Sequence, residues 1–213
     1  MSGFTPQRIR DLIDAATSVA GQTDLSSLLR STINTAIELT GARYGAVGII
    51  GEHGTLVDFI PVGMDEDDIK RISHYPRGTG VLGTIARHGV TLRLDEVSDH
   101  PDSVGFPENH PLMHTFLGVP VRVGERVFGN LYLAEKPGGF TADDETTAEL
   151  LAVTAGAAVA TLRLQERLRR VALQEDRERI ARDLHDSIIQ DLFAIGLSLQ
   201  TAMGHIEHDT ETV

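Results

Sequence analysis

The chain has 213 residues, a formal net charge of −12 and no cysteine. The length suffices for a domain of about 150 residues plus an appendage. The acidic balance argues against nucleic acid and anionic membrane surfaces as direct partners, because both require clustered Lys and Arg. The lack of cysteine excludes disulfides, thiolate metal sites and a cysteine nucleophile. No long apolar run or signal peptide is evident, so we expect a cytoplasmic protein without a membrane partner.

Two amphipathic helices are expected at the N-terminus. In the first, Pro6 to Val19, apolar residues recur at spacings of three and four, which is the period of one helical face. Asp24 is a suitable N-cap for the second helix, and Gly41 is a suitable C-terminal stop.

From Ala42 onward the apolar pattern changes to the alternating or continuous form that is typical of strands. The expected strands are residues 44–50, 56–61, 91–94, 115–123 and 126–134, and the last two form a hairpin. A short helix is expected near residues 63–73. The glycine-rich segment Pro76–Gly83 lacks the Lys of a phosphate-binding loop and is interpreted as a turn. Residues 95–114 form a long connection, and such connections are usually functional or mobile.

A long helix is expected at the C-terminal end. Thr141 and Asp144 have the spacing of a capping box, and no Gly or Pro occurs from Ala157 to Ile195. Helices of this length persist by pairing with another helix. The expected fold class is therefore α+β, an antiparallel sheet with flanking helices followed by a long C-terminal dimerisation helix.

One stretch of this helix carries a candidate chemical site. The residues that form its apolar stripe are Ile180, Ala181, Leu184, Ile188, Leu192, Ile195 and Leu199. His185 lies at the edge of the stripe, while Asp186 and Gln190, four residues apart, lie on a neighbouring wetter face. A neutral imidazole is a nitrogen nucleophile, and an adjacent carboxylate can orient it or take its proton as a phosphoryl group arrives. The alternative is a surface histidine on an ordinary dimer helix.

The run from Glu178 to Gln190 resembles the phosphoacceptor box of bacterial two-component histidine kinases with a His-Asp-x-x-x-Gln signature. The resemblance implies that His185 is phosphorylated, that Asp186 assists, and that Gln190 positions water for dephosphorylation. It also implies a homodimer, a response regulator receiver domain as partner, and an ATP-binding domain. No ATP-binding domain is present in this sequence, so we expect the chain to be a fragment that is inactive alone.

The preceding part of the chain resembles a GAF domain over roughly residues 7–165. The motifs that carry the resemblance are Pro76-Arg-Gly-x-Gly-Val-Leu-Gly, Phe116-Leu-Gly-Val-Pro-Val, Gly129-Asn-Leu-Tyr-Leu and Phe140-Thr-x-x-Asp-Glu. GAF domains are small-molecule sensors and dimer modules. The expected organisation is a sensor domain at residues 1–165, followed at 166–213 by a signalling helix and the first helix of the phosphoacceptor domain.

Haem b is the first candidate ligand. The segment His110-Pro-Leu-Met-His-Thr-Phe-Leu-Gly-Val-Pro120 is similar to a run in the haem-bearing GAF domains of mycobacterial hypoxia-sensing kinases, with Leu112 where they have Pro. The resemblance implies His110 as the iron ligand and Tyr132 as the distal residue. Imidazole is a good axial ligand, and a phenol can donate a hydrogen bond to a bound gas.

Two alternatives remain open at the sequence level. Lys136, Phe140 and Asp144 are similar to a motif of cyclic-nucleotide-binding GAF domains, although Glu135 stands where that motif has Asn. A purely structural interpretation of the same residues is that Lys136 pairs with Asp144 and clamps the loop, while Phe140 fills the core. The second alternative is a GAF dimerisation scaffold that binds no ligand.

Overall fold

The computed structural model of the chain describes residues 5–51, 55–72 and 78–210. The chain divides into two units, Met1–Arg163 and Leu164–Val213. The helix α5 (Ala142–Thr210) is continuous through the boundary between them, as the absence of Gly and Pro predicted.

A five-stranded antiparallel sheet forms the centre of the first unit. Its order is β2-β1-β5-β4-β3. The strands are β1 (Tyr44–Ile50), β2 (Leu56–Val62), β3 (Leu92–Leu94), β4 (Phe116–Val123) and β5 (Arg126–Ala134). The central strand β5 pairs with both β1 and β4. All five expected strands are confirmed, and the fold class is α+β.

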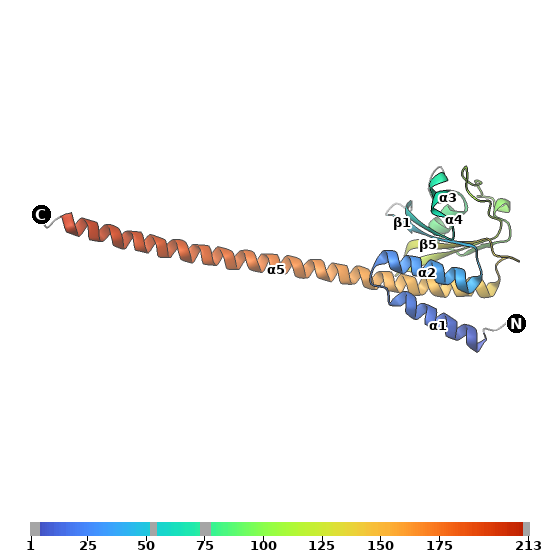
Figure 1. Cartoon of the computed structure of the whole chain (residues 1–213), viewed down its shortest axis with the longest axis horizontal. Coiled ribbons are helices and arrows are strands. Elements are labelled where there is room, and N and C mark those ends of the chain that lie inside the picture. The colour runs from blue at the N-terminus through green and yellow to red at the C-terminus, as the bar shows by residue number, and fades with distance from the viewer. Residues whose placement is uncertain (1–4, 52–54, 73–77, 211–213) are drawn as a thin grey trace. The chain divides into compact units, whose positions relative to one another are not determined.

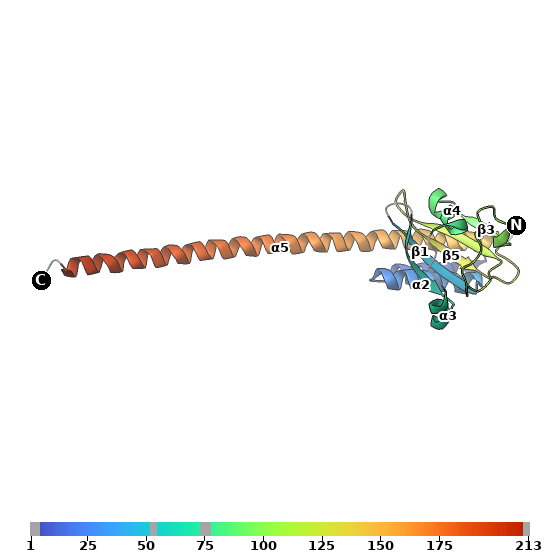
Figure 2. The ribbon, with the colours of Figure 1, turned by 90° about the horizontal axis from the view of Figure 1, so that it is seen from above.

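Helices cover the sheet on both faces (Figures 1 and 2). On one face lie α1 (Pro6–Ala20), α2 (Leu25–Thr40) and the first part of α5. The main core is buried between these helices and the sheet, with Leu28, Ile33, Leu131, Leu133 and Leu151 among its members. On the other face lie α3 (Glu66–Arg71) and α4 (Gly80–His88). Because side chains alternate along a strand, Tyr132 lies on that second face, between Leu131 and Leu133 on the first.

Local capping fixes the ends of α2 as the sequence indicates. The Asp24 carboxylate accepts a hydrogen bond from the backbone N–H of Ser27 at 2.9 Å. Gly41, which follows the helix, has the left-handed φ of 75° that glycine adopts without a Cβ clash. Both expected signals are confirmed.

The interpretation of Pro76–Gly83 as a turn is wrong for its second half. Residues 73–77 lie outside the described part, but the helix α4 begins at Gly80. Gly78 makes a turn with a φ of 74°, as a glycine-rich segment predicts. Gly83 is then inside the helix, where a Cβ would lie 2.1 Å from the carbonyl oxygen of Gly78. Close packing therefore requires glycine at position 83. The same glycine has low helix propensity, which is why the sequence pattern favoured a turn.

The first part of α5 is a core helix. A window within Ala142–His185 has a mean hydropathy of 1.3 and is long and apolar enough to cross a membrane by composition alone. On the inner face of the helix, however, Ala148, Leu151, Ala155 and Val159 are buried in the core of the first unit. Packing against the sheet therefore accounts for the buried part of this window, which is 39% of it.

Arg122, in β4, contacts helices on both faces of the sheet. On one face, its guanidinium Nη2 donates to the carbonyl oxygen of Gly89, at 2.8 Å. Gly89 is the C-cap of α4, with a left-handed φ of 62°. On the other face, α5 passes so close that a Cβ on Gly156 would lie 1.9 Å from the carbonyl oxygen of Arg122.

Candidate functional site

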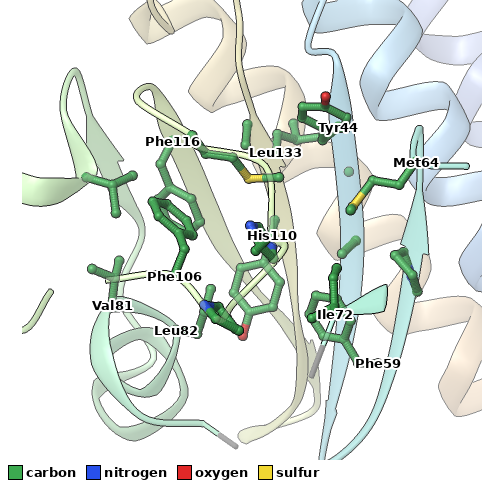
Figure 3. Close-up of a pocket in the computed structure, with 18 of the residues that line it drawn as sticks. Tyr44, Phe59, Met64, Ile72, Val81, Leu82, Phe106, His110, Phe116 and Leu133 are labelled. Atoms are coloured by element: carbon green, nitrogen blue, oxygen red, sulfur yellow. The ribbon is translucent and has the colours of Figure 1, made fainter. Parts of the chain in front are cut away.

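A pocket of about 700 Å³ lies against the second face of the sheet. Its walls come from β1, β2 and β5, from α3 and α4, and from the segment 103–113, which we call the strap. Figure 3 shows His110 in the middle of the pocket, with Val81 and Leu82 of α4 on one side and Phe59 and Met64 on the other. The lining is mostly aliphatic and aromatic, as in sites that bind small apolar molecules.

The strap places His110 in the pocket with a defined tautomer. Its ring Nδ1 lies 2.7 Å from the carbonyl oxygen of Pro111. A carbonyl only accepts, so Nδ1 carries the hydrogen and Nε2 of the neutral ring keeps its lone pair. The ring of Phe106 stacks on His110, with centroids 5.0 Å apart and an interplanar angle of 15°. Asn109 ties the strap to the end of α3 through a 3.2 Å hydrogen bond from Nδ2 to the carbonyl oxygen of Arg71.

Tyr132 lines the same pocket from the sheet. Only 4% of the residue is exposed, and burial raises the pKa of its phenol to about 12. The phenol is therefore neutral at physiological pH and can donate a hydrogen bond. The Nδ2 of Asn130, two residues earlier in β5, donates to the Tyr132 Oη at 2.9 Å.

The residues of the nucleotide-like motif have structural roles. The Lys136 ammonium forms an ion pair with the Asp144 carboxylate, whose side chain is 1% exposed. Asp144 also accepts hydrogen bonds from the backbone N–H and the hydroxyl of Thr141, both at 2.8 Å. Phe140 is buried in the main core. The structure confirms the predicted Lys136–Asp144 ion pair, the burial of Phe140 in the core and the capping box. None of these residues lines the pocket.

An ion pair anchors the chain just after the strap. The His114 Nδ1 lies 2.8 Å from the Glu96 Oε2. The hydrogen bond to Glu96 raises the pKa of His114 above its ordinary value. Since His114 does not line the pocket, it differs from His110 in position as well as in partner.

His185 lies on α5 in the second unit, where it is exposed. The neighbouring apolar residues Leu184 and Ile188 are 57% and 56% exposed. The side chains of Asp186 and Gln190 lie outside the described part of the structure. The two groups of predicted site residues therefore fall in different units, His110 with Tyr132 in the first and His185 in the second. Within residues 5–51, 55–72 and 78–210, no cluster of His, Asp or Glu could hold a metal ion.

Two features were not predicted from the sequence: helix α4, which lines the pocket, and Asn130, which donates to the hydroxyl of the pocket residue Tyr132. The position of Asn130 could have been inferred, because residues two apart in a strand share a face and Asn130 lies two residues before Tyr132 in β5. Helix α4 was not predicted because the glycines of Pro76–Gly83 have low helix propensity.

This fold, with a pocket between the open face of the sheet and the strap, is that of a small sensory α+β domain. Residues 22–160 match the model of the GAF domain family, and the chain belongs to that family. Further along, residues 176–213 match a histidine kinase family model. The segment that contains His185 is thus recognised separately from the sensor domain.

Individual relatives agree with both matches. The chain is 39% identical over 87 residues to the sensor histidine kinase YhcY of Bacillus subtilis; the aligned region is 39% of this chain and 22% of that protein. The fold is similar to that of the GAF domain of a phosphoenolpyruvate-protein phosphotransferase from Coxiella burnetii, with a TM-score of 0.65, 19% identity, and 75% and 96% of the two chains covered. The fold is also similar to that of a free methionine-R-sulfoxide reductase from Neisseria meningitidis, with a TM-score of 0.62 and 21% identity. This match covers 78% of this chain and 95% of that chain.

Proposed function

We propose that the chain is the input and phosphoacceptor portion of a sensor histidine kinase similar to the mycobacterial hypoxia-sensing kinases. The observation that carries the proposal is the joint presence, in one chain, of a GAF pocket and a histidine kinase segment with His185 exposed on its helix. A ligand in the pocket controls phosphorylation of His185 by the ATP-binding domain and onward transfer to a response regulator.

The proposed chemistry at His185 uses groups of this chain. The imidazole nitrogen attacks the γ-phosphorus of ATP, the bond from that phosphorus to the bridging oxygen breaks, and ADP leaves. The proton lost from the imidazole passes to the adjacent Asp186 carboxylate. When the kinase acts as a phosphatase, Gln190 orients the water that attacks the phosphoryl group of the response regulator and releases inorganic phosphate. A parallel homodimer buries the apolar stripe that includes Ile188 and Leu192, which are 56% and 62% exposed in one chain.

Haem is the proposed occupant of the pocket, and the residues fit it. The pocket volume of about 700 Å³ lies in the range of about 300–1,000 Å³ typical of small-molecule and cofactor sites. In the neutral tautomer of His110, the Nδ1 donates to the Pro111 carbonyl and the Nε2 has the lone pair that would bind iron, and such a second hydrogen bond is the usual way to orient a histidine ligand. Tyr132 supplies a neutral phenol on the sheet wall. When bound, haem supplies an iron that binds a diatomic gas.

Phosphorylation of His185 is tested by mixing the purified chain with the kinase's own ATP-binding domain and radiolabelled ATP. We expect an acid-labile, base-stable phosphoryl group on the wild-type chain and none on His185→Gln. The Gln190→Ala variant should still be phosphorylated and should support slower dephosphorylation of the response regulator. Persistent labelling of His185→Gln would refute the assignment.

Haem binding is tested by absorption spectroscopy of protein expressed with haem supplied. We expect a Soret band that is lost in His110→Ala. The matched control is His114→Ala, because His114 is exposed, pairs with Glu96 and does not line the pocket. A colourless wild-type protein that is still phosphorylated on His185 would reject haem and leave two roles for the domain. These are a sensor for another ligand and a dimerisation scaffold.

A further inference from the structure

The phenol of Tyr132 has a fixed position in the wall of the pocket. Its ring lies between those of Phe59 and Phe116, with centroid distances of 6.2 and 6.0 Å. Gly48, in the neighbouring strand β1, leaves space for the ring, because a Cβ there would lie 3.1 Å from Tyr132 Cε2. The ring therefore has little freedom, and the only adjustable part of the phenol is the direction of its O–H bond.

Asn130 determines that direction. Its side-chain N–H donates to the Tyr132 Oη at 2.9 Å, so the phenolic hydrogen points away from Asn130. Asn130 is fully buried, and its Oδ1 has no hydrogen-bond partner among the described residues. The reversed amide would instead bury an unpartnered N–H, which is rarer in proteins than an unpartnered carbonyl oxygen.

The neighbours of Asn130 explain why its amide acts on Tyr132 alone. Asn130 lies opposite Gly48 in β1 and Pro120 in β4. Neither residue has a polar side chain that could share the amide. Asn130 and Tyr132 are two residues apart in one strand and therefore point to the same face, which is the face that carries the pocket.

We propose that Asn130 is a specificity-determining positioning residue: it directs the O–H of Tyr132 into the pocket, so that the pocket selects apolar ligands that carry a hydrogen-bond acceptor. This inference rests on the proposed ligand-binding function and adds the chemical class of the ligand. A ligand without an acceptor leaves the buried O–H unpaired, whereas one with an acceptor satisfies it. Asn130 itself acts only through Tyr132.

Two probes of the same shape separate this role from packing. Acetophenone carries a carbonyl oxygen where α-methylstyrene carries a doubly bonded CH2 group, so only acetophenone has a lone-pair acceptor for the Tyr132 O–H. The affinity of each for the whole haem-free chain is measured by ligand-observed NMR titration, and the ratio of the two affinities is compared among variants. Comparing ratios cancels the difference in hydration between the probes.

We expect wild type to prefer acetophenone. Tyr132→Phe should lower the affinity ratio about tenfold, the size expected for one buried hydrogen bond. Asn130→Leu should lower it severalfold, because the O–H is then free to rotate. The double variant should fall no further than Tyr132→Phe, since both changes remove one interaction. Asn130→Ser, which is too short to reach Oη, is the second variant and should behave as Asn130→Leu does.

Several results would overturn the proposal. An unchanged ratio in both Asn130 variants would show that Asn130 does not orient the phenol. An equal loss of both probes would assign Asn130 a packing role, and additive effects in the double variant would separate it from Tyr132. Failure of both probes to bind wild type would remove the apolar ligand class. None of these results depends on the Soret band or on phosphorylation of His185, so the proposed function is judged separately.

Discussion

The ion pair between Lys136 and Asp144 is expected to contribute strongly to the stability of the first unit. The Asp144 side chain is 1% exposed and that of Lys136 is 20% exposed. Replacing Lys136 by Met leaves a buried carboxylate without its cation, and such changes cost about 3–5 kcal/mol. The two hydrogen bonds from Thr141 remain, so we expect about 3 kcal/mol, at the lower end of that range.

Removing the charge of Asp144 as well should restore part of the stability that Lys136→Met loses. The change Asp144→Asn keeps an acceptor for Thr141 but removes the charge, so Lys136→Met/Asp144→Asn should be more stable than Lys136→Met alone. The matched control is Lys70→Met, because the Lys70–Asp67 pair is exposed, at 69% and 83%, and such pairs contribute about 0–1 kcal/mol. A double variant no more stable than Lys136→Met would refute the reasoning.

The assay is urea unfolding of the whole chain followed by near-ultraviolet circular dichroism, since Tyr44 and Tyr132 lie in the first unit. Burial alone would raise the pKa of Asp144, but the hydrogen bonds from Lys136 and Thr141 outweigh it and lower the pKa. The contribution of a carboxyl with a lowered pKa is present above the ordinary Asp value and is lost as pH falls through the folded value. The destabilisation by Lys136→Met should therefore shrink in acid, where protonation removes the carboxylate charge that Lys136 balanced.

Three further predictions concern other parts of the chain. Ile188→Lys/Leu192→Lys should convert the proposed homodimer to a monomer in light scattering, because two charges would enter the apolar stripe that the proposal pairs. The pKa of His114, followed by NMR, should lie above its ordinary value and fall in Glu96→Gln; the stabilisation is present below the unfolded pKa and is lost as pH rises through the folded pKa. Gly156→Ala should destabilise the first unit by about 1–3 kcal/mol in urea unfolding, because its Cβ would overlap a backbone carbonyl.

Each of these has a control or a contrary outcome. Asp183→Lys introduces a lysine on the opposite face of the same helix by reversing a charge, and it should leave the proposed dimer intact. An unchanged His114 pKa in Glu96→Gln would exclude the carboxylate as the cause of the shift. Gly196, in the same helix as Gly156, has open space where a Cβ would lie, with nothing within 4 Å, so Gly196→Ala should not destabilise the chain.

Elements with local signals could be predicted from the sequence. The cap at Asp24, the stop at Gly41 and the box formed by Thr141 and Asp144 each depend on neighbours within a few residues. Helix α4 could not be predicted from helix propensity, because Gly83 is required by its close contact with the Gly78 carbonyl. That contact is not visible in the sequence.

The pocket shows the same contrast between local and long-range information. The family resemblance predicts His110 and Tyr132 as ligand-binding residues, and both line the pocket. Its volume depends on the path of the strap, which a bond between Asn109 and the Arg71 carbonyl, 38 residues apart in sequence, helps to set. A contact of that range leaves no periodic pattern. The role of Asn130 likewise requires knowledge of its cross-strand neighbours, Gly48 and Pro120.

The position of Arg122 has a mechanical consequence for the first unit. Its guanidinium holds the end of α4, which helps to form the pocket, while its carbonyl oxygen abuts the backbone of α5 at Gly156. At the second contact no side chain intervenes, so no rotamer change can absorb a displacement there. A single residue of β4 therefore contacts both α4 and α5, so a displacement of α4 is expected to act on α5 at this point. The Arg122 side chain can change rotamer whereas its carbonyl cannot, so only the contact with α4 can adjust without a movement of the backbone.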